Sequence, residues 1–156
     1  MRSPGLHFRE IQRRLHLANG ALEHHLRTLL RSGSLESERD GQFVRFYPPP
    51  IRHEERVYIS ILRQPRLREI ITFLILRPGS DYRTIAQELN LSPSTITWHL
   101  KRLQQVGVVT RGKKNDSELI CFQISEPERL TKILSAYRQS FLDKAVDSFL
   151  DTWENL

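Results

Sequence analysis

The chain has a single cysteine, no long uninterrupted apolar run and no apolar segment at its N-terminus. One thiol, Cys121, excludes an internal disulfide and a cysteine-based zinc site. The longest apolar stretch, residues 59–76, contains four charged side chains and a proline, so it lacks the ~20 apolar residues of a transmembrane helix. A hydrophobic content of 38% is nevertheless sufficient for cores. We therefore expect a globular, cytoplasmic protein without membrane contact.

The positive charge of the chain is concentrated in its first 124 residues. Residues 1–80 carry 14 basic and 8 acidic side chains, residues 81–124 carry 6 and 4, and residues 125–156 carry 4 and 6. Arginine supplies 19 of the 24 basic residues, and its planar guanidinium suits phosphate and guanine edges, although genome composition or growth temperature also enriches arginine. A regional basic excess is typical of a polyanion-binding surface, but an ordinary solvated surface would also account for it.

An internal repeat with an offset of 74 residues divides the chain. Ten of the 32 residues in 4–35 are identical in 78–109 without a gap. The identical pairs are Pro4/Pro78, Gly5/Gly79, Arg9/Arg83, Ile11/Ile85, Leu15/Leu89, Leu17/Leu91, His25/His99, Leu26/Leu100, Leu29/Leu103 and Gly33/Gly107. Most are apolar or glycine, as a shared fold requires. The sequence therefore predicts one small structural unit present twice, and not a solenoid.

Each copy predicts helices followed by a hairpin. The second copy predicts a helix over residues 67–76, a helix capped by Ser80 or Asp81, a helix that begins after Ser92, and a hairpin around residues 113–116. The first copy ends in a hairpin with an Asp-Gly turn at residues 39–42.

The first copy has no counterpart of the 67–76 helix. Its apolar residues Ile11, Leu15, Leu22, Leu26 and Leu29 therefore need another cover. The candidates are the helix predicted near residues 53–63, the C-terminal helix, a partner subunit, or residues upstream in a longer gene.

Helices, a tight turn, a further helix and a two-stranded wing form the layout of a winged helix-turn-helix domain. Residues 91–103, Leu-Ser-Pro-Ser-Thr-Ile-Thr-Trp-His-Leu-Lys-Arg-Leu, closely resemble the recognition-helix region of ArsR-like and MarR-like transcription regulators. The whole chain is similar to the tandem winged-helix regulators common in archaea, over residues 4–47 and 66–124.

This resemblance implies a mainly α fold with small β-hairpin wings. It divides the chain into a first winged-helix domain (1–50), a linker helix (51–65), a second winged-helix domain (66–124) and a C-terminal amphipathic helix (125–156). It also implies a sequence-specific regulator that binds double-stranded DNA and needs no cofactor. The alternative is a tandem winged-helix adaptor that binds protein in a larger assembly.

The candidate DNA-contacting residues lie opposite the predicted core. If Ile96, Leu100 and Leu103 are buried, a 100° step per residue places Thr97 and Lys101 on the other side, where they can enter a major groove. Matching helix positions in the first copy, and wing positions implied by the resemblance, complete the set. The candidates are Asn19, Gly20, Glu23, His24, Arg27, Arg39, Gln42, Arg45, Ser94, Thr95, Thr97, Trp98, Lys101, Arg102, Arg111, Lys113 and Lys114.

Two of these candidates and two histidines carry specific expectations. The Glu23 carboxylate repels phosphates unless it accepts from a cytosine amino group, so the first copy is expected to contact DNA more weakly or differently. Trp98 either stacks on a sugar or thymine methyl or packs under the wing. His25 and His99 share one repeat position, which predicts packing histidines with satisfied hydrogen bonds and no metal site. No phosphate-binding loop, nucleophile elbow or paired carboxylate set indicates an enzyme.

The C-terminal segment predicts an interaction surface. Residues 125–128, Ser-Glu-Pro-Glu, form a capping-box pattern, and apolar residues then recur every three or four positions over ~28 residues. They include Leu130, Ile133, Leu134, Tyr137, Phe141, Ala145, Phe149 and Trp153. One long or bent amphipathic helix with so broad a stripe predicts a homodimer formed through it. The alternative is packing against the linker helix and first domain.

Overall fold

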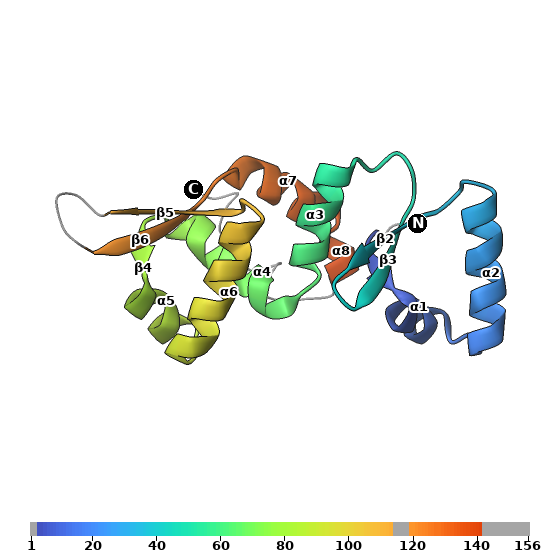
Figure 1. Ribbon diagram of the computed structural model, residues 1–156, viewed down its shortest axis with the longest axis horizontal. Coiled ribbons are helices and arrows are strands. Elements are labelled where there is room, and N and C mark those ends of the chain that lie inside the picture. Colours follow the sequence, from blue (N-terminus) through green and yellow to red (C-terminus); the bar gives the residue numbers. More distant parts are fainter. Residues whose placement is uncertain (1–2, 114–118, 142–156) are drawn as a thin grey trace. The chain divides into compact units, whose positions relative to one another are not determined.

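The computed structural model describes residues 3–113 and 119–141, which fall into two compact units (Figure 1). Unit 1 extends to Arg63 and unit 2 begins at Gln64. Each unit contains a three-stranded antiparallel sheet and several helices. Among the residues so described, none of the helices combines the length and the apolar character needed to cross a membrane.

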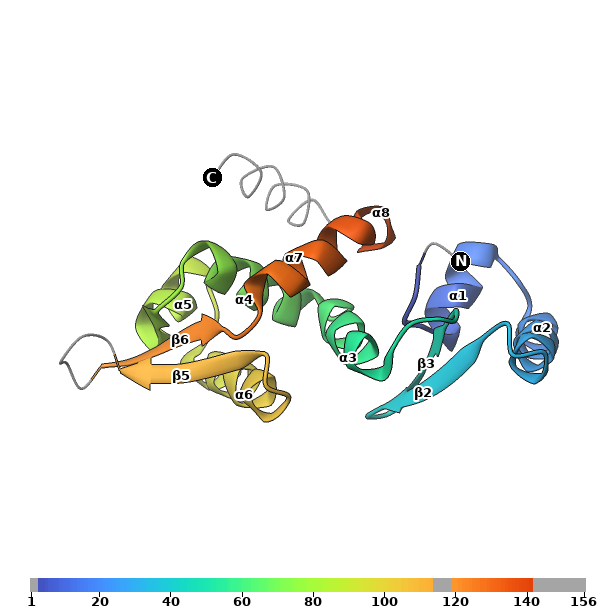
Figure 2. The same cartoon turned by 90° about the horizontal axis from the view of Figure 1, so that it is seen from above.

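Unit 1 contains a short strand, two helices, a hairpin and a third helix. Its elements are β1 (Leu6–His7), α1 (Phe8–Leu15), α2 (Asn19–Arg31), β2 (Glu36–Asp40), β3 (Phe43–Tyr47) and α3 (His53–Leu62). The strand order is β1-β3-β2, with β3 in the centre. Asp40 pairs with Phe43 across the predicted Asp-Gly turn, where Gly41 has a φ of 59°. The β2-β3 hairpin is the wing of this unit (Figure 2).

Unit 2 repeats this order after an additional helix and adds one short helix at its end. Its elements are α4 (Pro65–Leu76), β4 (Ser80–Asp81), α5 (Tyr82–Glu88), α6 (Pro93–Gln105), β5 (Val109–Lys113), β6 (Ile120–Ile124), α7 (Pro127–Ala136) and α8 (Arg138–Phe141). Asp81, and not Ser80, caps α5, because its carboxylate accepts from the Thr84 N–H at 2.9 Å. The hairpin of β5 and β6 is the second wing.

The two-residue strands β1 and β4 are a shared feature that local sequence patterns did not predict. In both units a glycine precedes the strand in the left-handed region, with a φ of 75° at Gly5 and 76° at Gly79. Both glycine N–H groups donate to the central strand of their sheet, to the carbonyl of Phe46 at 2.8 Å and of Phe122 at 2.9 Å. The predicted repeat is therefore confirmed in backbone conformation as well as in sequence.

Both faces of the unit 1 sheet are covered. On one face Phe46 packs with Leu6, Ile11, Leu22, Leu26 and Leu35 in a core below α1 and α2. On the other face Tyr47 lies against α3, where its hydroxyl contacts the Arg56 carbonyl at 3.4 Å. This burial raises the pKa of Tyr47 to about 12.

The end of α3 is bound to the start of the chain. The guanidinium of Arg63 donates to the Pro4 carbonyl at 2.7 and 3.0 Å. Beside it, a Cβ added at Gly5 would lie 2.7 Å from the Ile59 side chain, so only glycine allows this approach. The helix predicted as a linker therefore packs within unit 1.

Helices α4 and α6 contribute much of the core of unit 2. Leu67, Ile70, Ile71 and Leu74 of α4 are fully buried. Ile96, Leu100 and Leu103 of α6 are fully buried as well, which confirms the predicted inner face of that helix.

The C-terminal segment differs from its prediction in two respects. α7 begins after Glu126 without a side-chain cap, so the predicted capping box does not form. The backbone departs from helical geometry at Tyr137, with φ and ψ of −115° and 20°, and α8 follows as a separate short helix. The predicted apolar stripe continues into residues 142–156, which lie outside the described residues.

Candidate nucleic-acid interface

The exposed face of α6 is held in place by its cap and its buried face. The Ser92 hydroxyl accepts from the Thr95 N–H at 3.3 Å and Pro93 occupies the first helical position. Ser94, Thr97, Trp98 and Lys101 are exposed on the side opposite the core. A rigid helix thus displays two hydroxyls, an indole ring and a cation on one surface.

Trp98 lies on this exposed face and not under the wing. Its side chain is 57% exposed. The indole makes an edge-to-face contact with His99 at 4.9 Å, and the Arg102 guanidinium lies 5.7 Å from the ring centroid. Of the two predicted positions for this ring, the structure has the open one, where the indole can stack on a sugar or a thymine methyl.

Two further α6 candidates are engaged within unit 2. The Thr95 hydroxyl lies 2.7 Å from that of Ser92, in the capping network. Arg102 is half-buried and donates to the Gln64 side chain at the start of α4 at 2.7 Å. Thr95 thus contributes to the cap of α6, and Arg102 joins α6 to the start of α4.

The equivalent surface of unit 1 lies on α2. Asn19, Gly20, Glu23, His24 and Arg27 are all exposed. The Asn19 side-chain oxygen accepts from Gln12, which fixes its orientation at the start of the helix. A Cβ at Gly20 would meet nothing within 4 Å, so backbone can approach a ligand there. This face differs from that of α6 by its carboxylate at Glu23.

The wings add exposed polar and basic residues. Arg39 and Gln42 are exposed on the β2-β3 hairpin, and Arg111 and Lys113 on β5. Among the residues that the structure describes, Arg39 and Arg111 have no ion-pair partner, so their charge is available to an anion. Lys114 lies outside the described residues.

Both units match families of known proteins. Residues 1–59 match a family described as an N-terminal HTH domain, and residues 63–110 match a family described as winged helix-turn-helix DNA-binding. The chain has a tandem winged helix-turn-helix fold. The predicted fold class is therefore confirmed, and the matches support a DNA-binding transcription regulator.

A curated relative of this winged-helix protein is an uncharacterised HTH-type transcriptional regulator of Methanocaldococcus jannaschii. It is 28% identical over 124 residues, which cover 80% of this chain and 31% of the relative. The chain thus spans about a third of the length of the relative that it matches.

Several solved regulator structures are also similar. The PcaV transcriptional regulator of Streptomyces coelicolor with its natural ligand has a TM-score of 0.41 at 20% identity, covering 59% of this chain and 72% of that one. ZitR of Lactococcus lactis in complex with DNA has a TM-score of 0.38 at 14% identity, covering 90% and 85%. Because each TM-score is below 0.5, the fold assignment rests on the two domain matches and not on these structures.

Arg45 must be removed from the predicted winged-helix surface. Its side chain is only 3% exposed. The guanidinium donates to Asp40 at 2.7 Å and to the Gly5 carbonyl at 2.9 Å, and it lies 3.9 Å from Glu10. Alternation along β3 places Arg45 on the same face as Tyr47. Through its contacts with Gly5 and Glu10, this arginine joins β3 to the start of the chain.

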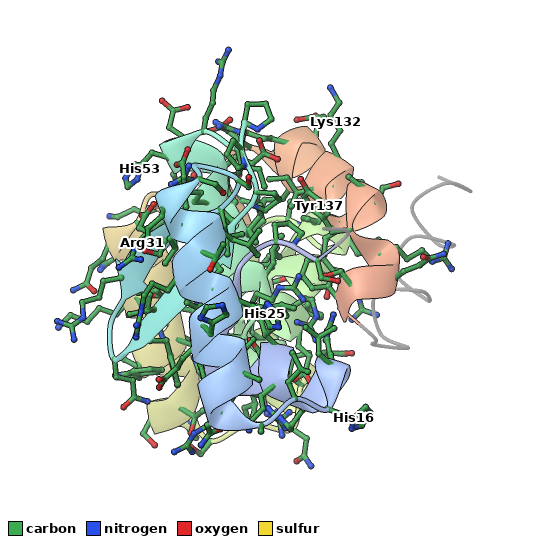
Figure 3. The ribbon with its side chains drawn as sticks, turned by 90° about the vertical axis from the view of Figure 1, so that its right-hand side faces the viewer. His16, His25, Arg31, His53, Lys132 and Tyr137 are labelled. Carbon is green, nitrogen blue, oxygen red and sulfur yellow. The ribbon has the colours of Figure 1, made fainter. Side chains whose placement is uncertain are left out.

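The histidines at the shared repeat position also differ from the prediction. His25 is exposed on an open side of α2 and does not pack in a core (Figure 3). His99 is half-buried, but its Nδ1 has no hydrogen-bond partner. Burial, together with the Arg102 and Arg66 charges, lowers the pKa of His99 and favours a neutral ring. The described residues contain no group of three or more potential metal ligands.

The sequence did not identify two exposed apolar residues of the unit 1 wing. Phe43 is 37% exposed and its ring stacks on His7 at 4.7 Å, while Val44 next to it is exposed. An unbroken Phe-Val-Arg-Phe-Tyr run does not show which members face solvent. The only available signal was the adjacent Asp-Gly turn, which places Phe43 at the wing tip.

Proposed function

We propose that this protein is a sequence-specific transcription regulator that binds double-stranded DNA as a homodimer in the cytoplasm. The observation that carries the proposal is α6, a capped helix whose apolar side is fully buried and whose opposite side displays Thr97, Trp98 and Lys101. The wing after this helix adds the exposed Arg111. A helix of this kind fits the major groove while its wing lies along the phosphates.

The candidate DNA-contacting residues divide into two groups. One group contacts phosphates and positions the protein, and the other contacts bases or sugars and reads the sequence. Lys101 and Arg111 are exposed and have no ion-pair partner within the described part of the chain, so phosphates can neutralise them on binding. Ser94 and Thr97 present hydroxyls to phosphates or base edges. Trp98 supplies apolar contact. In unit 1, Arg27 and Arg39 take the corresponding positioning role.

A homodimer suits this function because two-fold symmetry presents two identical recognition surfaces to two half-sites. The support comes from the sequence of the chain's end, which is acidic overall and carries a broad apolar stripe. Such a segment is suited to protein contact and not to DNA.

The salt dependence of binding to random-sequence duplex DNA tests the proposal. Each phosphate contact contributes about 0.9 to the slope of log affinity against log salt concentration. We expect Lys101→Ala with Arg111→Ala to weaken binding and to lower this slope by about one to two. Lys132→Ala removes an exposed charge from α7 and should leave the slope unchanged.

Selection of bound sequences from a random duplex pool then tests sequence specificity and symmetry. A recovered palindrome is the expected result for a homodimeric regulator. Absence of duplex binding at low salt would contradict the proposal and would favour a protein-binding adaptor.

A further inference from the structure

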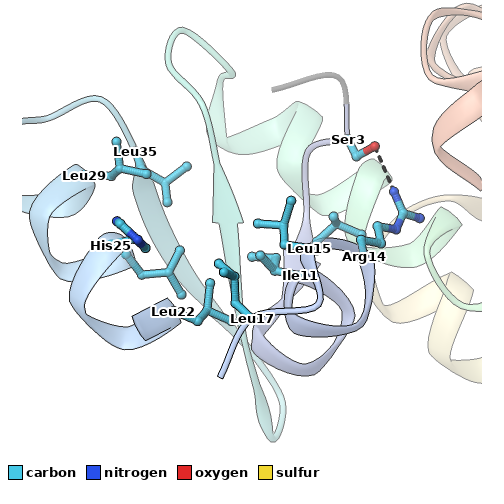
Figure 4. Close-up of a pocket in the computed structure, with 11 residues that line it drawn as sticks. Ser3, Ile11, Arg14, Leu15, Leu17, Leu22, His25, Leu29 and Leu35 are labelled. Atoms are coloured by element: carbon cyan, nitrogen blue, oxygen red, sulfur yellow. Dashed lines mark hydrogen bonds between the residues drawn. The ribbon is translucent and has the colours of Figure 1, made fainter. Parts of the chain in front are cut away.

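An open apolar groove lies between α1 and α2 of unit 1 (Figure 4). Its volume is about 320 Å³, and leucines and an isoleucine form most of its lining. Leu15 from α1 is 57% exposed there and Leu29 from α2 is 42% exposed. At one edge Arg14 donates to the Ser3 hydroxyl at 2.9 Å. The groove is thus an apolar surface with a basic rim.

The repeat shows what covers this surface in the other unit. Leu103, the counterpart of Leu29, is fully buried, and His99, the counterpart of the exposed His25, is half-buried. α4 lies beside this part of α6, because its cap residue Gln64 accepts from Arg102 at 2.7 Å. Arg66 and Glu69 of α4 are also close enough to act electrostatically on His99.

The described part of unit 1 contains no helix in the place of α4. Its first helix, α1, corresponds to α5 of unit 2. The remaining helix, α3, packs against Tyr47 and contributes no residue to the groove lining. The groove is therefore the site where a helix equivalent to α4 is missing.

The sequence of residues 142–156 has the properties that this site requires. The fully buried Leu67, Ile71 and Leu74 of α4 are spaced four and three residues apart. Leu142, Val146 and Phe149 repeat that spacing, and Trp153 lies four residues later.

The charges of the segment and the groove are also complementary. Residues 142–156 carry four acidic side chains and one basic, with aspartates at 143, 147 and 151 along one side of a helical projection. Residues 3–35, which contain α1 and α2, carry five arginines and two glutamates, and Arg14 lies at the groove itself.

We propose that the unit 1 groove binds residues 142–156 of a second copy of this chain. Each protomer has one groove and one such segment, so reciprocal exchange forms two identical contacts related by a two-fold axis. This contact rests on the homodimer proposed above and assigns a surface to it. The contact does not depend on DNA binding.

The oligomeric state of full-length variants tests the contact. Leu29→Asp places a charge in the groove, and Phe149→Asp places one in the segment. Light scattering should give a dimer for the wild type and a monomer for each variant. Leu30→Asp is the matched control, because Leu30 is also exposed on α2 but does not line the groove, and it should remain dimeric.

Mixing the two variants distinguishes this contact from others. A Leu29→Asp chain keeps its segment and a Phe149→Asp chain keeps its groove, so the mixture should recover a mixed dimer through one intact contact. A dimeric Leu29→Asp chain would overturn the groove as the interface while leaving the homodimer standing. A monomeric wild type would overturn the contact between two copies of the chain. DNA binding is tested separately, by the duplex-binding measurement above.

A cross-link provides a second test that does not depend on a disruptive substitution. Chains with Leu29→Cys and chains with Phe149→Cys, both also carrying Cys121→Ser, should form a disulfide-linked heterodimer when mixed under mild oxidation. Leu30→Cys in place of Leu29→Cys should give a much lower yield of the disulfide-linked heterodimer. Equal yields from the two positions would contradict the proposal.

Discussion

At the scale of single residues, Arg45 and Arg39 show how two arginines of one hairpin acquire different roles. Arg39 is exposed on β2, whereas Arg45 on β3 is enclosed with Asp40, Glu10 and the Gly5 carbonyl. Both residues fit a basic wing, so the sequence could not separate them. The difference arises from the partners of Arg45, and two of them, Glu10 and the Gly5 carbonyl, are distant in sequence.

We expect Arg45→Ala to destabilise unit 1 by about 1–3 kcal/mol, because it removes the buried guanidinium that donates to the Asp40 carboxylate and the Gly5 carbonyl. Arg39→Ala should change the free energy of unfolding by less than about 0.5 kcal/mol. Urea denaturation of the full chain monitored by circular dichroism measures both. An Arg45→Ala protein as stable as the Arg39→Ala protein would show that the buried guanidinium is not structural.

At the scale of elements, the helices that the sequence predicted best are those with clear start and stop signals. α6 begins at the predicted Ser92-Pro93 pair, and α4 ends before Pro78-Gly79. Elements defined by distant partners were missed: β1 and β4 are strands only because they pair with β3 and β6. The C-terminal segment had the apolar periodicity of one helix, but periodicity does not report the break at Tyr137.

The cap of α6 gives a prediction at this scale. Ser92→Ala removes the acceptor for the Thr95 N–H, and we expect it to lower the free energy of unfolding of unit 2 by about 1 kcal/mol. Ser94→Ala is the control, since this exposed hydroxyl, two residues further along, accepts no backbone N–H among the described contacts. Thermal denaturation compares the two. Equal stability of both variants would mean that the cap does not contribute to holding α6.

At the scale of the whole molecule, the repeat predicted two units, and the structure adds how they differ. Their backbones agree at the glycines before β1 and β4, but unit 2 has α4 and unit 1 has an open groove. The sequence indicated that the first copy has no counterpart of α4 and that its apolar residues need another cover, but it did not choose among the candidates. Only the folded chain shows that α3 lies on the opposite side of the sheet and leaves Leu29 exposed. The candidate DNA-contacting faces were predicted more completely, because they depend on helical periodicity.

The two α-helical faces differ most at one repeat position, where unit 1 has Glu23 and unit 2 has Thr97. Both residues are exposed. Exchanging them tests whether the units contribute unequally to DNA binding. We expect Glu23→Thr to strengthen binding to random duplex DNA about two- to fivefold at low salt, since it removes repulsion worth roughly 0.5–1 kcal/mol. Thr97→Glu should weaken binding by more, because it places a carboxylate beside Lys101 on the stronger surface.

Fluorescence anisotropy of labelled duplex measures both, and Glu55→Thr, a change of the same charge on α3, is the control. If Glu23→Thr and Glu55→Thr strengthened binding equally, the effect would reflect net charge alone and α2 would not be a DNA-contacting helix.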